Sequence, residues 1–267
     1  MPVKLPVIQH LAAVDSTNEH AFRELAAARA GHLDAWVADI QSAGRGRRGS
    51  TWFGAPGDSL MVSFALVGSA DRSLPTPALI SMTVGLALIG ALERLGLDPA
   101  RLMLDWPNDL CARTPSSPGR GRSGEAPKLA GILIEARDLD PTAPRFVVGV
   151  GLNVRGTLPA GLVAERPVTT LAELGLHTTP LEVAAALHRE LAERFELATR
   201  DTDRICSDYL DATGLGGLMV AIEMAGGIAK GRLILLEPGG LALLDDEDLL
   251  IRFALEHVQA IRPAPIY

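Results

Sequence analysis

The order of apolar and polar residues along the chain predicts a mixture of strands and helices. Apolar runs of strand length occur at 7–14, 35–40, 59–66, 101–110, 128–136 and 145–154. Apolar residues that recur every three or four positions predict helices at 16–31, 76–96, 180–200 and about 204–210. Pro107 interrupts the fourth strand, because proline cannot donate to a sheet ladder. The mixture indicates a domain in which helices pack on a sheet.

Local sequence signals predict where the first helix begins and ends and how deeply the first strand is buried. Ser16, followed three residues later by Glu19, fits a capping box at the helix N-terminus. Ala28 continues the apolar stripe of this helix, and Gly31 is its predicted C-cap. The strand at 7–14 is expected to be mostly buried, because apolar residues dominate it.

The character of the sequence changes after residue 213. Short apolar runs separated by turns predict a small all-β unit, so we divide the chain into domains 1–213 and 214–267. The stretch 113–127 is rich in Pro, Gly, Ser and Arg, which predicts a long mobile hairpin tip. The string GRGR at 119–122 is interpreted as part of that solvated tip.

Composition narrows the functional classes. The net charge of −7 argues against a general nucleic-acid binder. Two cysteines, Cys111 and Cys206, with no CxxC or Cys/His cluster, predict reduced thiols and no zinc or other metal site. The N-terminus lacks the pattern of a secretory signal, and no apolar run reaches about 18 residues, so we expect a cytoplasmic protein without a membrane span.

One loop stands out chemically: QSAGRGRRGSTWFG, residues 41–54. Its glycines let backbone amides approach an anion closely, and its arginines donate in a fork that matches phosphate or carboxylate. Trp52 and Phe53 follow the arginines and offer a surface on which a flat ring can stack. A plain solvated surface loop is the alternative interpretation.

Three further motifs carry polar groups beside apolar elements. STN at 16–18 places small polar side chains at a helix N-terminus, which favours an anion or a carbonyl, although simple capping would also explain it. DWPND at 105–109 sets Asn108 at a strand end, where a turn is the alternative. Lys128 opens an apolar strand, either as an edge guard or as a charge aimed into a cleft.

Together with the sequence GVGLNV, these motifs resemble those of the biotin protein ligases, also called biotin–[acetyl-CoA-carboxylase] ligases. The matching stretches, in order, are STN, QSAGRGRRG followed by a tryptophan, WPNDL, KLAGILIE and GVGLNV. The resemblance implies an α+β fold: a mixed β-sheet flanked by helices, with a small C-terminal SH3-like β-barrel. Only fifteen residues precede STN, so we expect a form without the N-terminal DNA-binding domain and no binding to DNA.

The resemblance implies an ATP-dependent ligase, in which biotin is activated as biotinyl-5′-AMP and passed to a lysine of the biotin carboxyl carrier protein. Mg²⁺ is the implied metal ion, bridging the ATP phosphates, and a homodimer is left open. The implied catalytic residues are Lys128, Arg47 and Arg45. The implied biotin site is Ser16, Thr17, Asn18, Gln41, Arg45, Gly46, Arg47 and Lys128. The implied ATP and adenylate site is Arg45, Arg47, Arg48, Trp52, Asn108 and Lys128. The arginine loop is expected to close over the adenylate and shield it from water.

The chain departs from the family pattern in three places. The family motif is Lys-Trp-Pro-Asn-Asp, whereas Asp105 begins it here, so an anion replaces a cation near the expected phosphates. Either Asp105 points away, or another basic residue supplies the lost charge, or the first step is impaired. We expect it to point outward, into solvent or toward an arginine such as Arg101. Ser50 replaces a frequent basic residue, and the hairpin at 113–127 is longer than usual.

Three other functions remain open. A lipoate or octanoate ligase would share the fold but needs a long apolar tunnel. A non-catalytic protein that binds biotin or biotinyl-AMP would explain Asp105. An RNA binder would explain the arginine loop, although the acidic balance argues against it.

Overall fold

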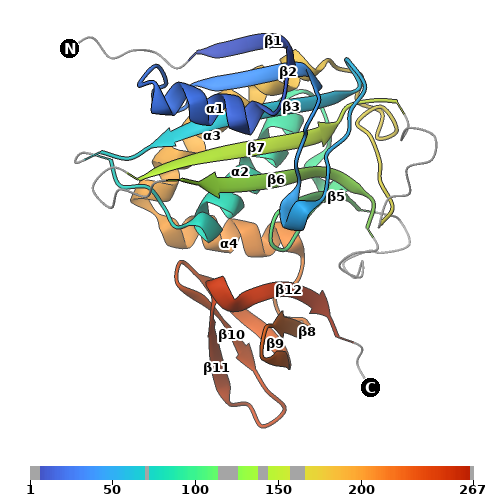
Figure 1. Ribbon diagram of the computed structural model, residues 1–267. Helices are drawn as coiled ribbons and strands as arrows, with labels where there is room; N and C mark the ends of the chain where they lie inside the picture. The colour runs from blue at the N-terminus through green and yellow to red at the C-terminus, as the bar shows by residue number, and fades with distance from the viewer. Residues whose placement is uncertain (1–6, 70–71, 114–125, 138–143, 157–165, 265–267) are drawn as a thin grey trace.

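The computed structural model describes residues 7–69, 72–113, 126–137, 144–156 and 166–264. Seven strands form a mixed sheet in the order β1-β2-β3-β7-β6-β5-β4 (Figure 1). They are β1 (Ile8–Val14), β2 (Ala35–Gln41), β3 (Ser59–Val67), β4 (Leu102–Asp105), β5 (Asp109–Ala112), β6 (Lys128–Ala136) and β7 (Arg145–Asn153). β1 pairs with β2 in parallel, and the other neighbouring pairs are antiparallel.

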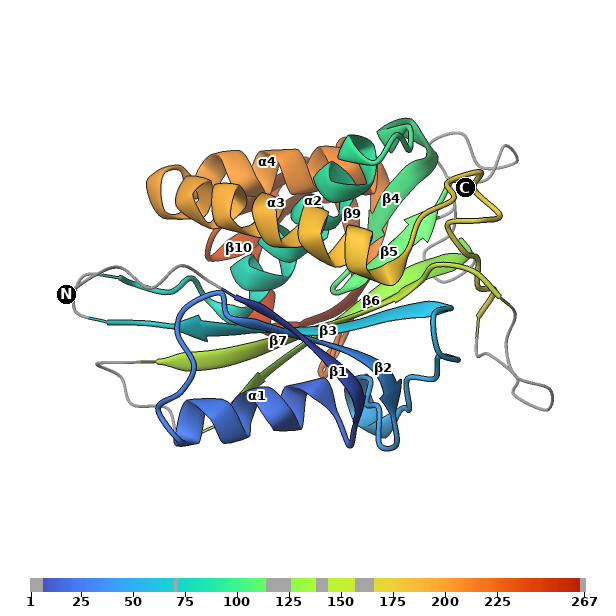
Figure 2. The same ribbon diagram turned by 90° about the horizontal axis from the view of Figure 1, so that it is seen from above.

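Helices cover both faces of this sheet (Figure 2). α1 (Thr17–Ala26) lies on one face, and α2 (Pro77–Arg94), α3 (Pro180–Arg200) and α4 (Thr202–Thr213) lie on the other. The larger core forms between the sheet and α2, where Phe64, Leu88 and Leu104 are almost fully buried. A smaller core under α1 contains Phe22 and Trp36. Burial of these two apolar layers is the main force that holds the sheet between the helices.

α2 is the most buried helix of the described chain, and its composition reflects that position. It is long and apolar enough to cross a membrane by length and composition alone, but 67% of the stretch is buried within the protein. Its apolar residues are interrupted by Ser81, Thr83, Glu93 and Arg94, so it is not an unbroken apolar run of about 18 residues, in agreement with the sequence analysis. α2 is enclosed by the sheet on one side and by α3 on the other. Such a helix is apolar on all sides because, like a membrane span, it has little contact with water.

Three local predictions in the N-terminal region were wrong. Ser16 is the N-cap of α1, but its side chain makes no capping hydrogen bond, and Glu19 pairs with Arg45 and Arg137. The helix ends at Ala26, so Ala28, with φ 55°, and Gly31 lie beyond it. β1 is a half-exposed edge strand rather than a buried one, because only β2 pairs with it.

The C-terminal unit is a second, antiparallel sheet in the order β11-β10-β9-β8-β12. Its strands are β8 (Met219–Met224), β9 (Gly227–Glu237), β10 (Gly240–Leu244), β11 (Leu250–Ala254) and β12 (Val258–Pro263). This sheet fits the expected SH3-like unit. It contacts the first unit directly, because Trp106 Nε1 donates to Val258 O at 3.1 Å. The exact division at residues 213 and 214 stays a prediction.

Candidate functional site

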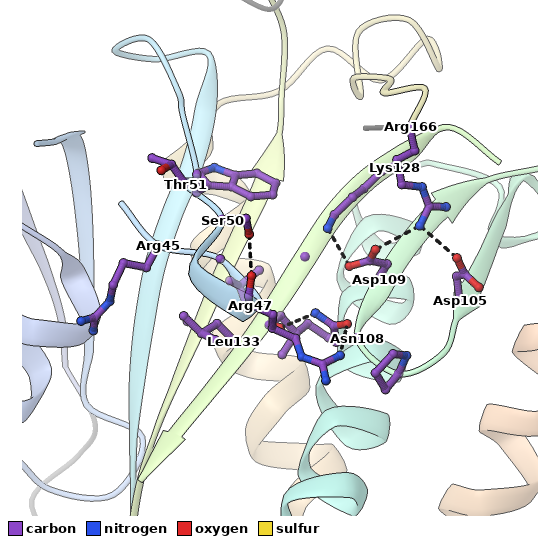
Figure 3. Close-up of a pocket in the computed structure, with 18 of the residues that line it drawn as sticks. Arg45, Arg47, Ser50, Thr51, Asp105, Asn108, Asp109, Lys128, Leu133 and Arg166 are labelled. Carbon is purple, nitrogen blue, oxygen red and sulfur yellow. Dashed lines mark hydrogen bonds and ion pairs between the residues drawn. The ribbon is translucent and has the colours of Figure 1, made fainter. Parts of the chain in front are cut away.

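A cleft of about 900 Å³ opens where the first helix, the arginine loop and strands β5, β6 and β7 meet. Its lining includes groups from every motif that the sequence singled out, namely Ser16, Gln41, Arg47, Asn108, Lys128 and Gly151. The arginine loop, the turn at Pro107, strands β6 and β7 and a helix N-terminus therefore face one space. Figure 3 shows the charged side chains on its two sides.

The N-terminus of α1 forms a buried polar wall of the cleft. Ser16, Thr17 and Asn18 are each less than 5% exposed. Thr17 donates to Gln41 Oε1 from its backbone N–H at 2.7 Å and from its hydroxyl at 3.0 Å. Ser63 from β3 lies 2.7 Å from Thr17 Oγ1 and also contacts Asn18 Oδ1. These hydrogen bonds fix the side chains, so the wall is prepared for a small polar ligand.

The arginine loop is a small hairpin with its own hydrogen bonds. Gly46 N donates to Ser50 O at 2.7 Å, and a 3₁₀ turn, Arg47–Gly49, forms the tip. Gly49 has φ 79°, a left-handed conformation that side chains disfavour, and a Cβ at Gly46 would lie 2.4 Å from Ser50 Oγ. The backbone of the tight turn therefore favours glycine at position 49, whereas at position 46 Ser50 would have to move.

Two of the loop's three arginines, Arg45 and Arg47, point in different directions. Arg45 turns away from the cleft's other cations (Figure 3) and pairs with Glu19 at 2.6 Å and Glu135 at 2.9 Å. Hydrogen bonds from Arg137, and then from Arg45, lower the pKa of Glu19 to about 2. Arg47 turns the other way, and its Nη1 donates to Asn108 Oδ1 at 2.8 Å. Arg47 and Asn108 therefore form one side of the cleft, and Arg45 does not join them.

At the far end of the cleft, four charged side chains form one cluster (Figure 3). Lys128 Nζ lies 2.7 Å from Asp109 Oδ1. Arg166 Nη1 lies 3.0 Å from Asp105 Oδ2 and 3.1 Å from Asp109 Oδ2. Asp105 is 6% exposed. The expectation that it points outward was wrong, and so was its suggested partner, because Arg101 donates to Leu174 O at 2.6 Å instead.

Trp52 lies on the floor of the cleft, over two neighbouring strands. A Cβ built on Gly151 of β7 would lie 2.3 Å from Trp52 Cε2, and one on Gly131 of β6 would lie 3.4 Å from Cζ3. The two glycines are direct cross-strand partners. Lys128 Nζ lies 5.9 Å from the centre of the indole ring. Glycines in both strands leave a flat floor on which a ring can rest.

Sequence reasoning missed several groups in the cleft. Arg166 lies in the segment before α3, and no motif points to it. Two further groups support the site without lining it: Ser63 hydrogen-bonds to the α1 wall, and Glu135 pairs with Arg45, both from otherwise apolar strands. The C-terminal sheet contributes Glu223, Gln259 and Arg262 to the lining. The Arg48 side chain, which was assigned to the ATP site, lies outside the described residues. Most of the predicted hairpin tip at 113–127 lies outside them as well.

The sequence profile of the Biotin/lipoate A/B protein ligase family matches residues 11–153, more than half of the chain. The chain belongs to this family. All five motifs except the last residue of GVGLNV fall within the matched range. The predicted family is thus confirmed.

Two bacterial ligases have sequences similar to this chain. The bifunctional ligase/repressor BirA of Escherichia coli is 32% identical over 187 residues, which cover 70% of this chain and 53% of that protein. The biotin–[acetyl-CoA-carboxylase] ligase of Paracoccus denitrificans is 35% identical over 176 residues, covering 64% of this chain and 66% of that protein. The match thus spans about half the length of the first relative.

A solved structure supports the fold of this family member. The biotin protein ligase of Aquifex aeolicus in complex with biotin and ATP superposes with a TM-score of 0.74 at 24% identity, covering 97% of this chain and 100% of that one. The likeness extends over both sheets. The predicted fold class, a mixed sheet with helices followed by a small SH3-like unit, is confirmed.

Proposed function

We propose that this protein is an ATP-dependent biotin ligase, which makes biotinyl-5′-AMP and transfers the biotinyl group to a lysine of a biotin carboxyl carrier protein. The observation that carries the proposal is the convergence of the polar α1 wall, the arginine loop, Asn108 and Lys128 on one cleft. The names of the Paracoccus denitrificans and Escherichia coli relatives support the same reaction.

In the first step, a carboxylate oxygen of biotin attacks the α-phosphorus of ATP. The bond from that phosphorus to the bridging oxygen breaks, and pyrophosphate leaves with the electron pair. Negative charge grows on the α-phosphate oxygens, and Lys128 would stabilise it from its position beside the floor of the cleft. Arg47 would hold a phosphate oxygen, after exchanging its hydrogen bond with Asn108.

The fixed hydrogen bonds of Thr17, Asn18 and Gln41 would orient the ureido ring of biotin, which needs donors and acceptors at set places. Trp52 would support the adenine ring. Arg45 would first have to leave Glu19 and Glu135 to reach a ligand anion. These assignments follow the family pattern residue by residue and stay predictions.

In the second step, an unprotonated lysine amine of the carrier attacks the acyl carbon of the anhydride. The acyl–oxygen bond breaks, AMP leaves, and the amine loses a proton as the amide forms. Mg²⁺ would arrive on the phosphates of ATP as part of that substrate. Among the described residues no group of three or more His, Cys, Asp or Glu could hold a metal ion, so the chain itself offers no separate cage there.

Two alternatives receive less support. A lipoate or octanoate ligase needs a long apolar tunnel, whereas this cleft is lined by Arg47, Asn108, Lys128 and the polar α1 wall. A non-catalytic binding protein was suggested by Asp105. The pairing of Asp105 with Arg166 removes that reason, because the anion is neutralised inside the protein.

The test is to incubate the protein with ATP, Mg²⁺, biotin and a purified carrier domain. Intact-mass measurement of the carrier reports transfer, and pyrophosphate release without the carrier reports the first step. We expect both signals, and we expect neither when lipoate replaces biotin. Pyrophosphate release without any carrier modification would leave only the activation half of the proposal, and the absence of both signals would refute it.

A further inference from the structure

The charge cluster at the end of the cleft differs from the one that the family motif predicts. With a lysine at position 105, this end would hold two cations, at 105 and 128, and one anion, Asp109. With Asp105 in place of that lysine, the net charge of the three side chains would change from +1 to −1, next to the expected phosphates of ATP. Arg166 returns the net charge of the cluster to zero, because the cluster then holds two cations and two anions.

The geometry shows how Arg166 is held. Nη1 meets both carboxylates, and Nη2 donates to Ala126 O at 2.9 Å and to Cys111 Sγ at 3.0 Å. Its Nε is buried and has no hydrogen-bond partner among the described residues. With all four of its Nη protons directed at protein atoms, Arg166 is poorly placed to grip a ligand directly.

The backbone around Arg166 is tied to the strand that carries Lys128. Lys128 N donates to Pro167 O at 2.8 Å, and Thr169 N donates to Lys128 O at 3.0 Å. The segment thus runs alongside the start of β6, so that Arg166 and Lys128 approach Asp109 together. Each cation contacts a different oxygen of that carboxylate, Oδ2 and Oδ1 respectively.

We propose that Arg166 is a positioning residue for Lys128, and that the Asp105–Arg166 pair replaces the lysine of the family motif. The inference rests on the proposed function. Arg166 neutralises Asp105 and shares the charge of Asp109. Lys128 is therefore only partly neutralised by Asp109, and its ammonium group stays available to the phosphates. Without Arg166, Lys128 would be the only described cation at Asp109 and would be held more tightly by it.

The test is a charge cycle measured by pyrophosphate release, with separate KM values for ATP and biotin. Arg166→Gln leaves a net −1 in the cluster. It should raise the KM for ATP about ten- to thirtyfold at low salt, with little change for biotin. Adding Asp105→Asn restores the balance to zero, because only Lys128 and Asp109 remain charged. This double variant should bring the KM for ATP back to within about threefold of the wild type.

Two further variants separate electrostatics from folding. Asp105→Asn alone should fold and should lower the KM for ATP at low salt, even if Arg166→Gln is unstable. Arg101→Gln removes an exposed arginine outside the cleft, together with its hydrogen bond to Leu174 O, and should lower thermal stability without changing the KM for ATP. No rescue by the double variant, or a raised KM in Asp105→Asn, would overturn the role of Arg166. An inactive wild type would instead count against the proposed function.

Discussion

The flat glycine floor of the cleft gives a sharp prediction: Gly151→Ala should impair ATP use much more than it impairs folding. The new Cβ would lie 2.3 Å from Trp52 Cε2, whereas ordinary contacts begin at 3.4 Å. The indole must therefore move by about 1 Å or more. Trp52 belongs to the arginine loop and is only partly buried, so it can move without opening the core.

The expected magnitudes follow from that displacement. A misplacement of about 1 Å near the reacting groups can cost up to about 100-fold in rate, so we expect kcat/KM for ATP to fall roughly 10- to 100-fold. That corresponds to about 1.4–2.7 kcal/mol of lost transition-state stabilisation. The free energy of unfolding should change by less than about 1 kcal/mol, because alanine is favoured over glycine within a strand.

Gly85→Ala is the matched control. Its Cβ would lie 2.9 Å from Leu104 Cδ2, in the core between α2 and the sheet, and neither residue lines the cleft. Overpacking there costs about 1–3 kcal/mol, partly offset by the helix preference of alanine. Chemical denaturation and pyrophosphate release should therefore rank the two variants in opposite order. If Gly151→Ala keeps kcat/KM for ATP within threefold of the wild type, the floor does not support the nucleotide.

Three further predictions concern single side chains. Lys128→Ala should slow pyrophosphate release about 100- to 1,000-fold while the fold survives, because Arg166 still pairs with Asp109. Arg47→Gly should still form the adenylate but lose it to solution, so that bystander proteins become biotinylated at high biotin concentration. Burial, with the nearby charge of Arg72, lowers the pKa of His32 from about 6.5 to about 4. Because the folded protein binds the His32 proton more weakly than the unfolded chain, the free energy of unfolding should fall by up to about 3 kcal/mol as the pH drops from 6.5 to about 4. His32→Gln should flatten this part of the unfolding profile.

Each of these predictions has an outcome that contradicts it. A Lys128→Ala rate within threefold of the wild type would remove this lysine from the chemistry. Strict labelling of the carrier by Arg47→Gly would assign the clamp to another residue. Equal loss of stability between pH 6.5 and 4 in the wild type and in His32→Gln would show that other groups govern this part of the acid limb.

The sequence alone determined the elements with long and regular patterns, and the family. α3 follows the predicted range, because its period is sustained over 21 residues and its N-cap, Thr179, forms a capping box with Glu182. The turn after α2 also follows, with Gly96 at φ 99°. Such features depend on residues that are close in the chain, so propensity and spacing predict them. The motifs likewise indicated which polar residues share a cleft, because the family pattern carries that information.

Only the tertiary structure decided which partner each charge takes. At the predicted capping box, Glu19 pairs with Arg45 and Arg137, which are remote in sequence, and Ser16 forms no side-chain cap. β1 is an edge because of strand order, which its own apolar pattern does not encode. Asp105 faces inward because Arg166, 61 positions away, reaches it from the segment before α3. A buried carboxylate is tolerated only beside a cation, and whether one is near depends on how distant segments pack.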